Sequence, residues 1–152
     1  MEISDLLKPD SVVTLKASSK KQVLQELAKV AAQATELSER KIFDTLLERE
    51  RLGTTGVGNG IAIPHGKLSE LSALHGVFAR LEKPVDFEAI DDHPVDLVFL
   101  LLAPDQAGAD HLKALARVSR LLRNTANCDK LRGAINTDGL FMLLTQSEAQ
   151  AA

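Results

Sequence analysis

Aromatic residues are scarce in this 152-residue sequence, which has neither tryptophan nor tyrosine and only five phenylalanines. The balance of charge is slightly acidic, with a formal net charge of −3 at pH 7. Proteins that bind nucleic acids usually combine a basic patch with aromatic side chains on which bases stack. We therefore expect no nucleic-acid partner.

Cysteine and long apolar runs are also scarce. Cys128 is the only cysteine, so no internal disulfide can form, which suits a reducing compartment. Residues 1–5 lack the basic and apolar regions of a signal peptide. The longest apolar run, residues 95–103, contains Asp96 and falls well short of the roughly 20 residues that a membrane helix needs. We expect a cytoplasmic protein with no membrane partner.

The length and the 45% hydrophobic content suit one domain, residues 1–152, with a core of its own. No repeat or linker divides the chain. Residue patterns predict strands at 11–15, 61–63, 74–81 and 95–103, and helices at 19–34, 38–52, 110–123, 128–134 and 138–144. The run 95–103 does not alternate between apolar and polar residues, so we expect it to be covered on both faces. Interleaved strands and helices predict a layered α/β domain.

Residues 53–67 form the most unusual stretch, with four glycines within eight positions followed by Ile-Ala-Ile-Pro-His-Gly-Lys. Pro64 fixes its own φ and favours extended geometry at Ile63, which predicts a strand over 61–63 with His65 at its end. Gly66 lets another backbone or a ligand come close. Because imidazole has a pKa near neutral and can act as a nucleophile, His65 is a candidate reactive residue.

Known phosphate-binding motifs do not fit this stretch. A P-loop has four residues between its first glycine and Gly-Lys and then Ser or Thr, whereas five residues separate Gly60 from Gly66 and Leu68 follows Lys67. A dinucleotide fingerprint runs from strand through glycines to helix, whereas these glycines follow a predicted helix and precede a predicted strand. Both nucleotide interpretations fail on context.

The run 49–67 (Arg-Glu-Arg-Leu-Gly-Thr-Thr-Gly-Val-Gly-Asn-Gly-Ile-Ala-Ile-Pro-His-Gly-Lys) resembles the signature of phosphotransferase-system enzyme IIA domains of the fructose/mannitol type. The similarity extends through 94–99 and 111–122 and is strongest to the nitrogen-regulatory branch. This resemblance implies a three-layer α/β/α fold with a central mixed sheet and helices on both faces. It also implies that an HPr-like phosphocarrier protein phosphorylates His65 on Nε2, with His111 and Arg49 as further active-site residues. The implied targets are regulatory proteins linked to nitrogen, carbon or potassium physiology.

The chemistry of these side chains agrees with such roles. Arg49 follows Ile42 and Leu46 at helical spacing, so its stem shares the buried side of its helix, and its planar fork suits a phosphate. His111 lies in the first turn of the predicted helix 110–123, where free N–H groups favour an anion, and it should point toward the sheet together with Leu112. The other positions expected to bind phosphate through backbone N–H groups are Gly56, Gly58, Gly60 and Gly66. The donor arrives activated, so we expect no cofactor and no metal.

Each assignment has an alternative. His111 could cap its helix or fill the core, and Arg49 could offset the helix dipole. His75 and His93 are expected to be structural or solvated, and the four histidines lack the short spacing of a zinc site. For function, the first alternative is a sugar-transport IIA component that passes phosphate to a sugar-specific IIB domain. The second is a hydrolase with His65 as nucleophile, for which no neighbouring serine or second carboxylate is evident.

Overall fold

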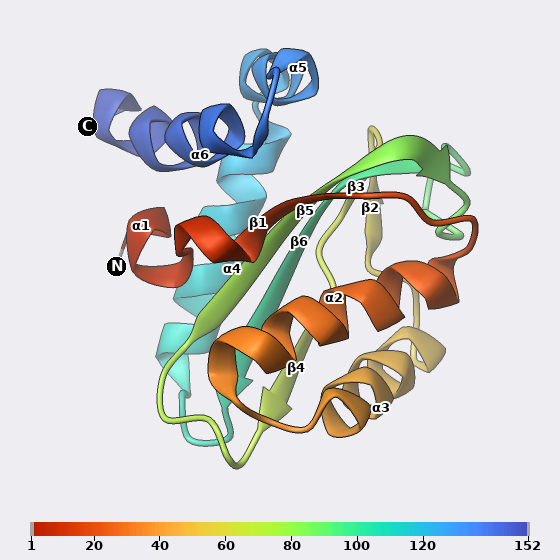
Figure 1. Cartoon of the computed structure of the whole chain (residues 1–152), viewed down its shortest axis with the longest axis vertical. Helices are drawn as coiled ribbons and strands as arrows, with labels where there is room; N and C mark the ends of the chain where they lie inside the picture. The colour runs from red at the N-terminus through yellow and green to blue at the C-terminus, as the bar shows by residue number, and fades with distance from the viewer. Residues whose placement is uncertain (1, 152) are drawn as a thin grey trace.

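The structure is a computed structural model that describes residues 2–151, with the side chains of residues 2–146. It is a mixed β-sheet with helices on both faces, which confirms the expected fold class (Figure 1). The helical elements are α1 (Ile3–Leu6), η1 (Pro9–Ser11), α2 (Lys20–Thr35), α3 (Glu39–Arg51), α4 (Ala109–Arg123), α5 (Thr125–Gly133) and α6 (Thr137–Ala151). The strands are β1 (Val12–Leu15), β2 (Gly56–Gly58), β3 (Ile61–Ala62), β4 (His65–Leu68), β5 (His75–Val85) and β6 (Val95–Pro104).

The sheet is built around β6. Its strands lie in the order β1-β5-β6-β3-β2, and β4 also pairs with β6. The long hairpin partner β5 runs antiparallel to β6 and parallel to β1. Both β3 and β4 run parallel to β6 in one continuous register, with Ile61 opposite Leu97 and His65 opposite Leu101. These two short strands therefore form a single line along the same side of β6.

The position of His65 differs from the prediction. The strand expected over 61–63 ends at Ala62, and His65, expected just beyond the end of that strand, is the first residue of a separate strand, β4. Pro64 causes the interruption, because proline has no N–H with which to continue the ladder. Its carbonyl still accepts a hydrogen bond from Leu101 N at 2.9 Å, so the chain stays in line and resumes pairing at His65.

Side-chain caps fix the starts of α2 and α3 where the sequence predicts them. Ser19 Oγ accepts from Gln22 N at 3.1 Å, and Ser38 Oγ accepts from Lys41 N at 3.2 Å. The Gln22 side chain accepts from Ser18 N at 2.8 Å, one residue earlier than in a standard capping box. α2 and α3 therefore begin at fixed points and lie together on one face of the sheet (Figure 1).

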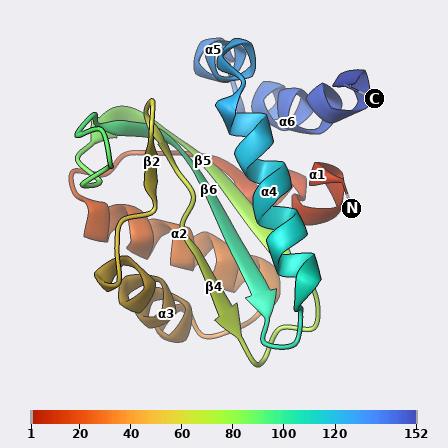
Figure 2. The ribbon, with the colours of Figure 1, turned by 180° about the vertical axis from the view of Figure 1, so that it is seen from behind.

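Alternate residues of β6 feed two separate hydrophobic clusters. Val98, Leu100 and Leu102 pack with side chains of α2 and α3, whereas Leu97, Phe99 and Leu101 pack with α1, α4, α5 and α6. Figure 2 shows α4 crossing the second face. All six of these β6 residues are fully buried, which confirms that this strand is covered on both sides.

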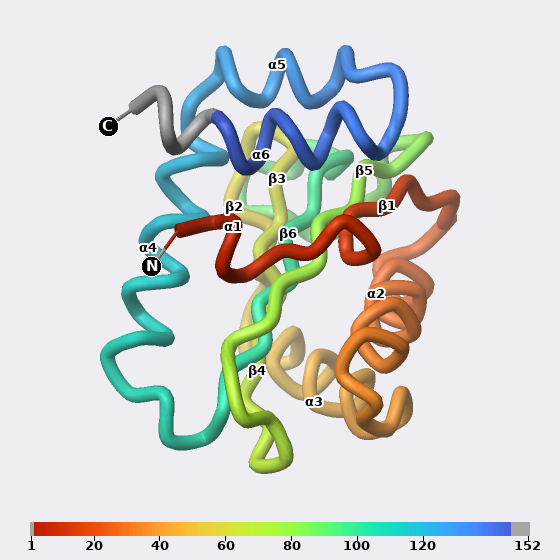
Figure 3. The backbone as a smooth tube through the Cα atoms, turned by 60° about the vertical axis from the view of Figure 1, so that its left-hand side comes forward, coloured from red at the N-terminus to blue at the C-terminus, as the bar shows by residue number. Residues whose placement is uncertain are grey.

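The helices after β6 depart from the sequence pattern at one residue and at their ends. Leu112 was expected to face the sheet but is 69% exposed, since the buried stripe of α4 runs through His111, Ala114 and Val118. Leu112 lies one residue, about 100°, away from that stripe. α5 begins at Thr125 and α6 extends to Ala151, so both are longer than predicted, and they lie side by side at one end of the molecule (Figure 3). Within residues 2–151, no helix has the length and apolar character needed to cross a bilayer.

Candidate functional site

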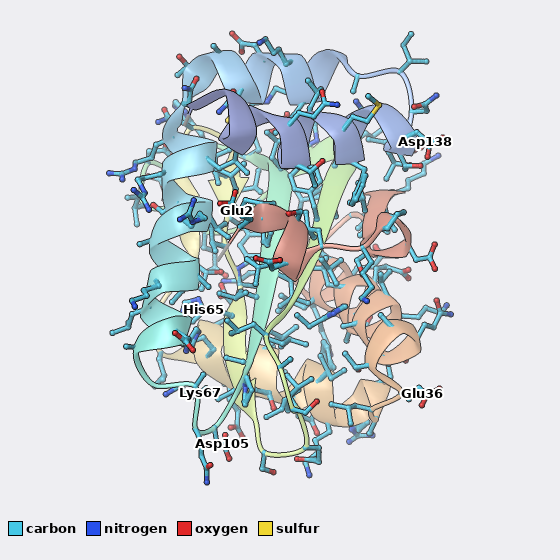
Figure 4. All side chains as sticks on the ribbon, turned by 90° about the vertical axis from the view of Figure 1, so that its left-hand side faces the viewer. Glu2, Glu36, His65, Lys67, Asp105 and Asp138 are labelled. Carbon is cyan, nitrogen blue, oxygen red and sulfur yellow. The ribbon has the colours of Figure 1, made fainter. Side chains whose placement is uncertain are left out.

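A pocket of about 580 Å³ lies where the end of α3, the start of β4 and the first turn of α4 meet. Figure 4 shows His65 beside α4, with Lys67 further along the same strand. The pocket is lined by Thr45, Glu48, Arg49, Arg51, Leu52, His65, Gly66, Lys67 and His111. The structure thus brings together the three side chains that the sequence singles out, although they come from distant parts of the chain.

Both ring nitrogens of the His65 imidazole form hydrogen bonds. Nδ1 lies 2.9 Å from the carbonyl oxygen of Ile63, and Arg49 Nε donates to Nε2 at 3.3 Å. A carbonyl can only accept, so Nδ1 carries the hydrogen, and Nε2 is left with the lone pair that accepts from Arg49. In this tautomer the ring presents the lone pair of Nε2 to Arg49 at the pocket.

Arg49 occupies the last turn of α3 and is half-buried, as the helical spacing predicts. Besides the contact with His65, its Nη1 donates to the carbonyl oxygen of Gly53 at 2.9 Å. Two hydrogen bonds from different edges of the guanidinium hold it in one orientation. A permanent positive charge is thereby fixed next to the nucleophilic nitrogen.

His111 approaches His65 from the first turn of α4. The two ring centroids are 5.9 Å apart, with the rings inclined at 66°. The residue is 7% exposed, and its Nε2 is buried without a hydrogen-bond partner. Burial lowers the pKa of His111, and the positive charge of Lys67 lowers it further, so the neutral ring is favoured at pH 7. An unpartnered nitrogen of this kind can serve a ligand in the pocket.

The glycines separate into two groups. Gly66 lines the pocket, but Gly56 and Gly58 lie in β2, and Gly60 closes the β2–β3 hairpin. None of these last three is among the residues that line the pocket. At Gly60, where φ is +80°, an added Cβ would lie 2.7 Å from Arg132 Nη2, so this glycine serves a turn and a close packing contact. Of the four glycines expected to bind phosphate, the structure therefore places Gly66 alone at the pocket.

Several features of the site escape the sequence reasoning. Thr45, Glu48 and Leu52 share the pocket face of α3 with Arg49, at spacings of three and four residues that helical periodicity could have revealed. Glu50 belongs to the charged run 48–51, yet it is only 8% exposed.

The remaining histidines lie outside the pocket. His75 is buried with Nε2 3.4 Å from Ser11 Oγ, and His93 is exposed beside Asp91. These placements agree with the structural and solvated roles expected for them. Among the residues whose side chains are described, no group of three or more His, Cys, Asp or Glu is arranged to hold a metal ion.

Comparisons with known proteins agree on one family. A family model described as "Phosphoenolpyruvate-dependent sugar phosphotransferase system, EIIA 2" matches residues 5–147. The nitrogen regulatory protein of Bradyrhizobium diazoefficiens is 55% identical over 153 residues, covering 100% of both chains.

Solved structures share the fold. Nitrogen regulatory protein IIA-Ntr from Neisseria meningitidis superposes with a TM-score of 0.89 at 32% identity, covering 94% of this chain and 99% of that chain. Enzyme IIAMTL of Escherichia coli, solved in a complex with phosphorylated enzyme IIBMTL, gives a TM-score of 0.76 at 20% identity, covering 91% of this chain and 96% of that chain. At that identity the second likeness concerns the fold.

Proposed function

This chain belongs to the EIIA 2 family of the phosphoenolpyruvate-dependent sugar phosphotransferase system and is a homologue of nitrogen regulatory proteins, and on that premise we propose that His65 accepts a phosphoryl group from an HPr-like phosphohistidine protein. The observation that carries the proposal is the pair of hydrogen bonds on His65. Ile63 O engages Nδ1, and Arg49 Nε points at the lone pair of Nε2. The acceptor atom is thus Nε2.

The transfer exchanges one N–P bond for another. The lone pair of His65 Nε2 attacks phosphorus in line with the departing imidazole of the donor, whose N–P electrons return to its own nitrogen. The hydrogen on Nδ1 stays in its bond to Ile63 O, so no proton has to leave the ring during the step. The proposed role of the protein is to position the two rings and to balance the charge on the phosphoryl oxygens.

Arg49 and His111 are placed for that charge balance. When phosphorus occupies Nε2, the guanidinium of Arg49 loses its acceptor and can donate to phosphoryl oxygens instead. The unpartnered Nε2 of His111 can donate an N–H to another of these oxygens when the ring is in the tautomer that carries its hydrogen on Nε2. Two donors from different helices would then hold the phosphoryl group.

Exposed leucines beside the pocket favour a protein donor over a small molecule. Leu52, which lines the pocket, is 85% exposed, and Leu112, next to His111, is 69% exposed. Large apolar side chains around a half-buried reactive group are typical of a surface that a partner covers. The HPr-like protein is the partner that we propose for this surface.

We propose that regulatory proteins read the phosphorylation state of His65. A phosphoryl group adds about 1.5 to 2 negative charges at neutral pH, enough to change which surfaces fit the pocket rim. The homologous proteins are named nitrogen regulatory proteins, which favours a regulatory output. A sugar-transport role is the second candidate, favoured by the fold shared with enzyme IIAMTL, whose structure includes phosphorylated enzyme IIBMTL.

The test is phosphoryl transfer from a labelled, phosphorylated HPr-like protein. We expect the wild-type chain to take up the label, His65→Ala to take up none, and the control His93→Ala to match the wild type. Label on His65→Ala at the wild-type rate would refute the proposal. Adding a sugar-specific IIB domain to the labelled chain then separates the two candidates, since rapid passage of the label to that domain would favour sugar transport.

A further inference from the structure

Glu50, the neighbour of Arg49 on α3, has no part in the chemistry described above, yet it is one of the few buried charged residues among the described side chains. We infer that Glu50 is a positioning residue that orients the imidazole of His65 through a chain of hydrogen bonds. The inference rests on the proposed phosphoryl transfer for its kinetic consequence, but its structural part concerns His65 alone.

The anchor of this chain is the Glu50 carboxylate. Its Oε1 accepts from the backbone N of Thr55 at 3.0 Å and forms an ion pair with Lys20 Nζ at 2.9 Å. The Glu50 side chain is 4% exposed and that of Lys20 is 17% exposed, so both charges are largely shielded from water. Lys20 comes from the first turn of α2, which the Ser19 cap fixes. Thr55 is thereby tied to a rigid part of the fold.

From Thr55 the hydrogen bonds lead to the reactive ring. The carbonyl oxygen of Thr55 accepts from Ile63 N at 3.0 Å, and the carbonyl oxygen of Ile63 accepts from His65 Nδ1 at 2.9 Å. His65 Nε2 in turn accepts from Arg49 Nε at 3.3 Å. Because Arg49 and Glu50 are adjacent in the sequence, the chain closes into a circuit that begins and ends on the last turn of α3.

Each link of the circuit restricts the next one. The Glu50 carboxylate fixes the position of the Thr55 backbone N–H. The Thr55 carbonyl in turn fixes the position of the Ile63 peptide. The Ile63 carbonyl then selects the tautomer of His65 that carries hydrogen on Nδ1. That tautomer leaves the lone pair on Nε2, which is the atom the transfer requires. Loss of the carboxylate should therefore allow the ring to tilt or to exchange its tautomer.

The second carboxylate oxygen supports a role beyond packing. Glu50 Oε2 is buried without a hydrogen-bond partner, and so is the hydroxyl oxygen of Thr55. Buried polar atoms without partners are unfavourable, and an apolar side chain at position 50 would avoid the unpartnered Oε2, although it would leave Thr55 N without its acceptor. The carboxylate is nevertheless present, where a charged acceptor holds a backbone N–H more strongly than a neutral one would.

The experiment compares Glu50→Gln and Glu50→Ala with the wild type and with the control Glu39→Gln, which removes a carboxylate from the exposed first turn of the same helix. Histidine ¹⁵N NMR reports the tautomer of His65. Phosphoramidate, a small phosphoryl donor that releases ammonia when its P–N bond breaks, reports reactivity without any protein partner. The rate is measured against donor concentration so that the maximal rate and the KM are separated.

We expect Glu50→Ala to lower the maximal rate about tenfold to a hundredfold, as a displaced reactive group would. Glu50→Gln, which retains an acceptor for Thr55 N, should lie between Glu50→Ala and the wild type. The KM should stay within about twofold, because the donor's binding groups are untouched. In both variants the NMR signal of the tautomer with hydrogen on Nε2 should grow, and Glu39→Gln should match the wild type in every measurement.

Wild-type tautomer populations and a wild-type maximal rate in folded Glu50→Ala would overturn the inference. If Glu50→Ala does not fold, the same result in Glu50→Gln would overturn it. A failure of the proposed function looks different, because the wild-type chain itself would then take no phosphoryl group, while the NMR comparison would still decide whether Glu50 orients the ring.

Discussion

Replacing His111 with leucine separates a functional role of this residue from a structural one, because the two roles predict opposite effects on stability. His111 is 7% exposed and its Nε2 has no hydrogen-bond partner. If its role is to serve the phosphoryl group, the fold carries an unsatisfied buried nitrogen. If instead the ring filled the core or capped α4, its removal would destabilise the protein.

The expected magnitudes follow from this environment. A buried polar atom without a partner costs about 1 to 3 kcal/mol, and leucine removes that penalty at similar volume in a helix that it favours. His111→Leu should therefore unfold at the wild-type temperature or a few degrees above it, at about 2 to 4 °C per kcal/mol for a chain of this size. The ring is neutral at pH 7 because burial lowers its pKa, so the substitution removes no charge.

The rate of phosphoryl transfer should fall in His111→Leu, although its stability is retained or raised. Loss of one preorganised donor to a developing anion lowers a rate by about 10² to 10³. Thermal unfolding followed by circular dichroism measures the first effect, and quenched-flow transfer from the phosphorylated HPr-like protein measures the second. His93→Leu, which alters an exposed histidine, is the matched control. A His111→Leu protein that is destabilised by more than about 1 kcal/mol and transfers at the wild-type rate would refute the reasoning.

Three further predictions concern other parts of the molecule. Arg49→Lys should slow transfer about tenfold or more, because a single ammonium cannot reproduce two hydrogen bonds from a planar fork to the acceptor ring and to Gly53 O; unchanged rapid-quench kinetics would contradict this. Burial lowers the pKa of His75, and Lys8 lowers it by a smaller amount. The neutral His75 ring therefore makes its full contribution to the free energy of unfolding above the unfolded pKa near 6.5, and this contribution is lost as pH falls through the folded pKa. Urea titrations at pH 7.5 and 5.5 should accordingly show a smaller loss of unfolding free energy for His75→Gln than for the wild type, and equal losses would count against it. Gly60→Ala should destabilise the fold by roughly 1 to 3 kcal/mol, since φ is +80° and the new Cβ would meet Arg132, but transfer per folded molecule should be unchanged; a slower transfer step would return this glycine to the phosphate site.

The parts of the fold that sequence reasoning predicts well are those decided locally. Ser19 and Ser38 define the helix starts because an N-cap bond spans only three residues. β6 is recognisable because its apolar residues fill both faces. Arg49 was placed correctly on the buried side of α3 by its spacing alone. The meeting of this residue with His65 and His111 was expected only from the family resemblance.

What could not be predicted depends on partners far away in the sequence. In the sequence, Glu50 belongs to a charged run that is typical of a solvated helix face. In the structure it is paired with Lys20, thirty positions earlier in the sequence. From the sequence, Gly58 and Gly60 can equally serve a phosphate loop or a hairpin, and the structure shows a β2–β3 hairpin in which Asn59 N donates to the distant Asp91 carboxylate at 2.9 Å. Leu112 fits an apolar stripe as well as its neighbours do, but the residues of α4 that pack on the sheet are His111, Ala114 and Val118, which leaves Leu112 exposed.

The location of His65 in the sheet is compatible with the reactive role that we propose for it. β3 is paired with β6 on one side and with β2 on the other, whereas within the described chain β6 is the only strand that pairs with β4. The backbone of His65 is therefore fixed on one side by β6, while its other side is free for α3 to approach. Gly66 makes that approach possible, since a Cβ there would lie 2.8 Å from Thr45 Cγ2. A larger residue should push α3 away and lengthen the 3.3 Å contact from Arg49 Nε to His65 Nε2, so under the proposed function Gly66 would affect transfer through the distance between α3 and β4.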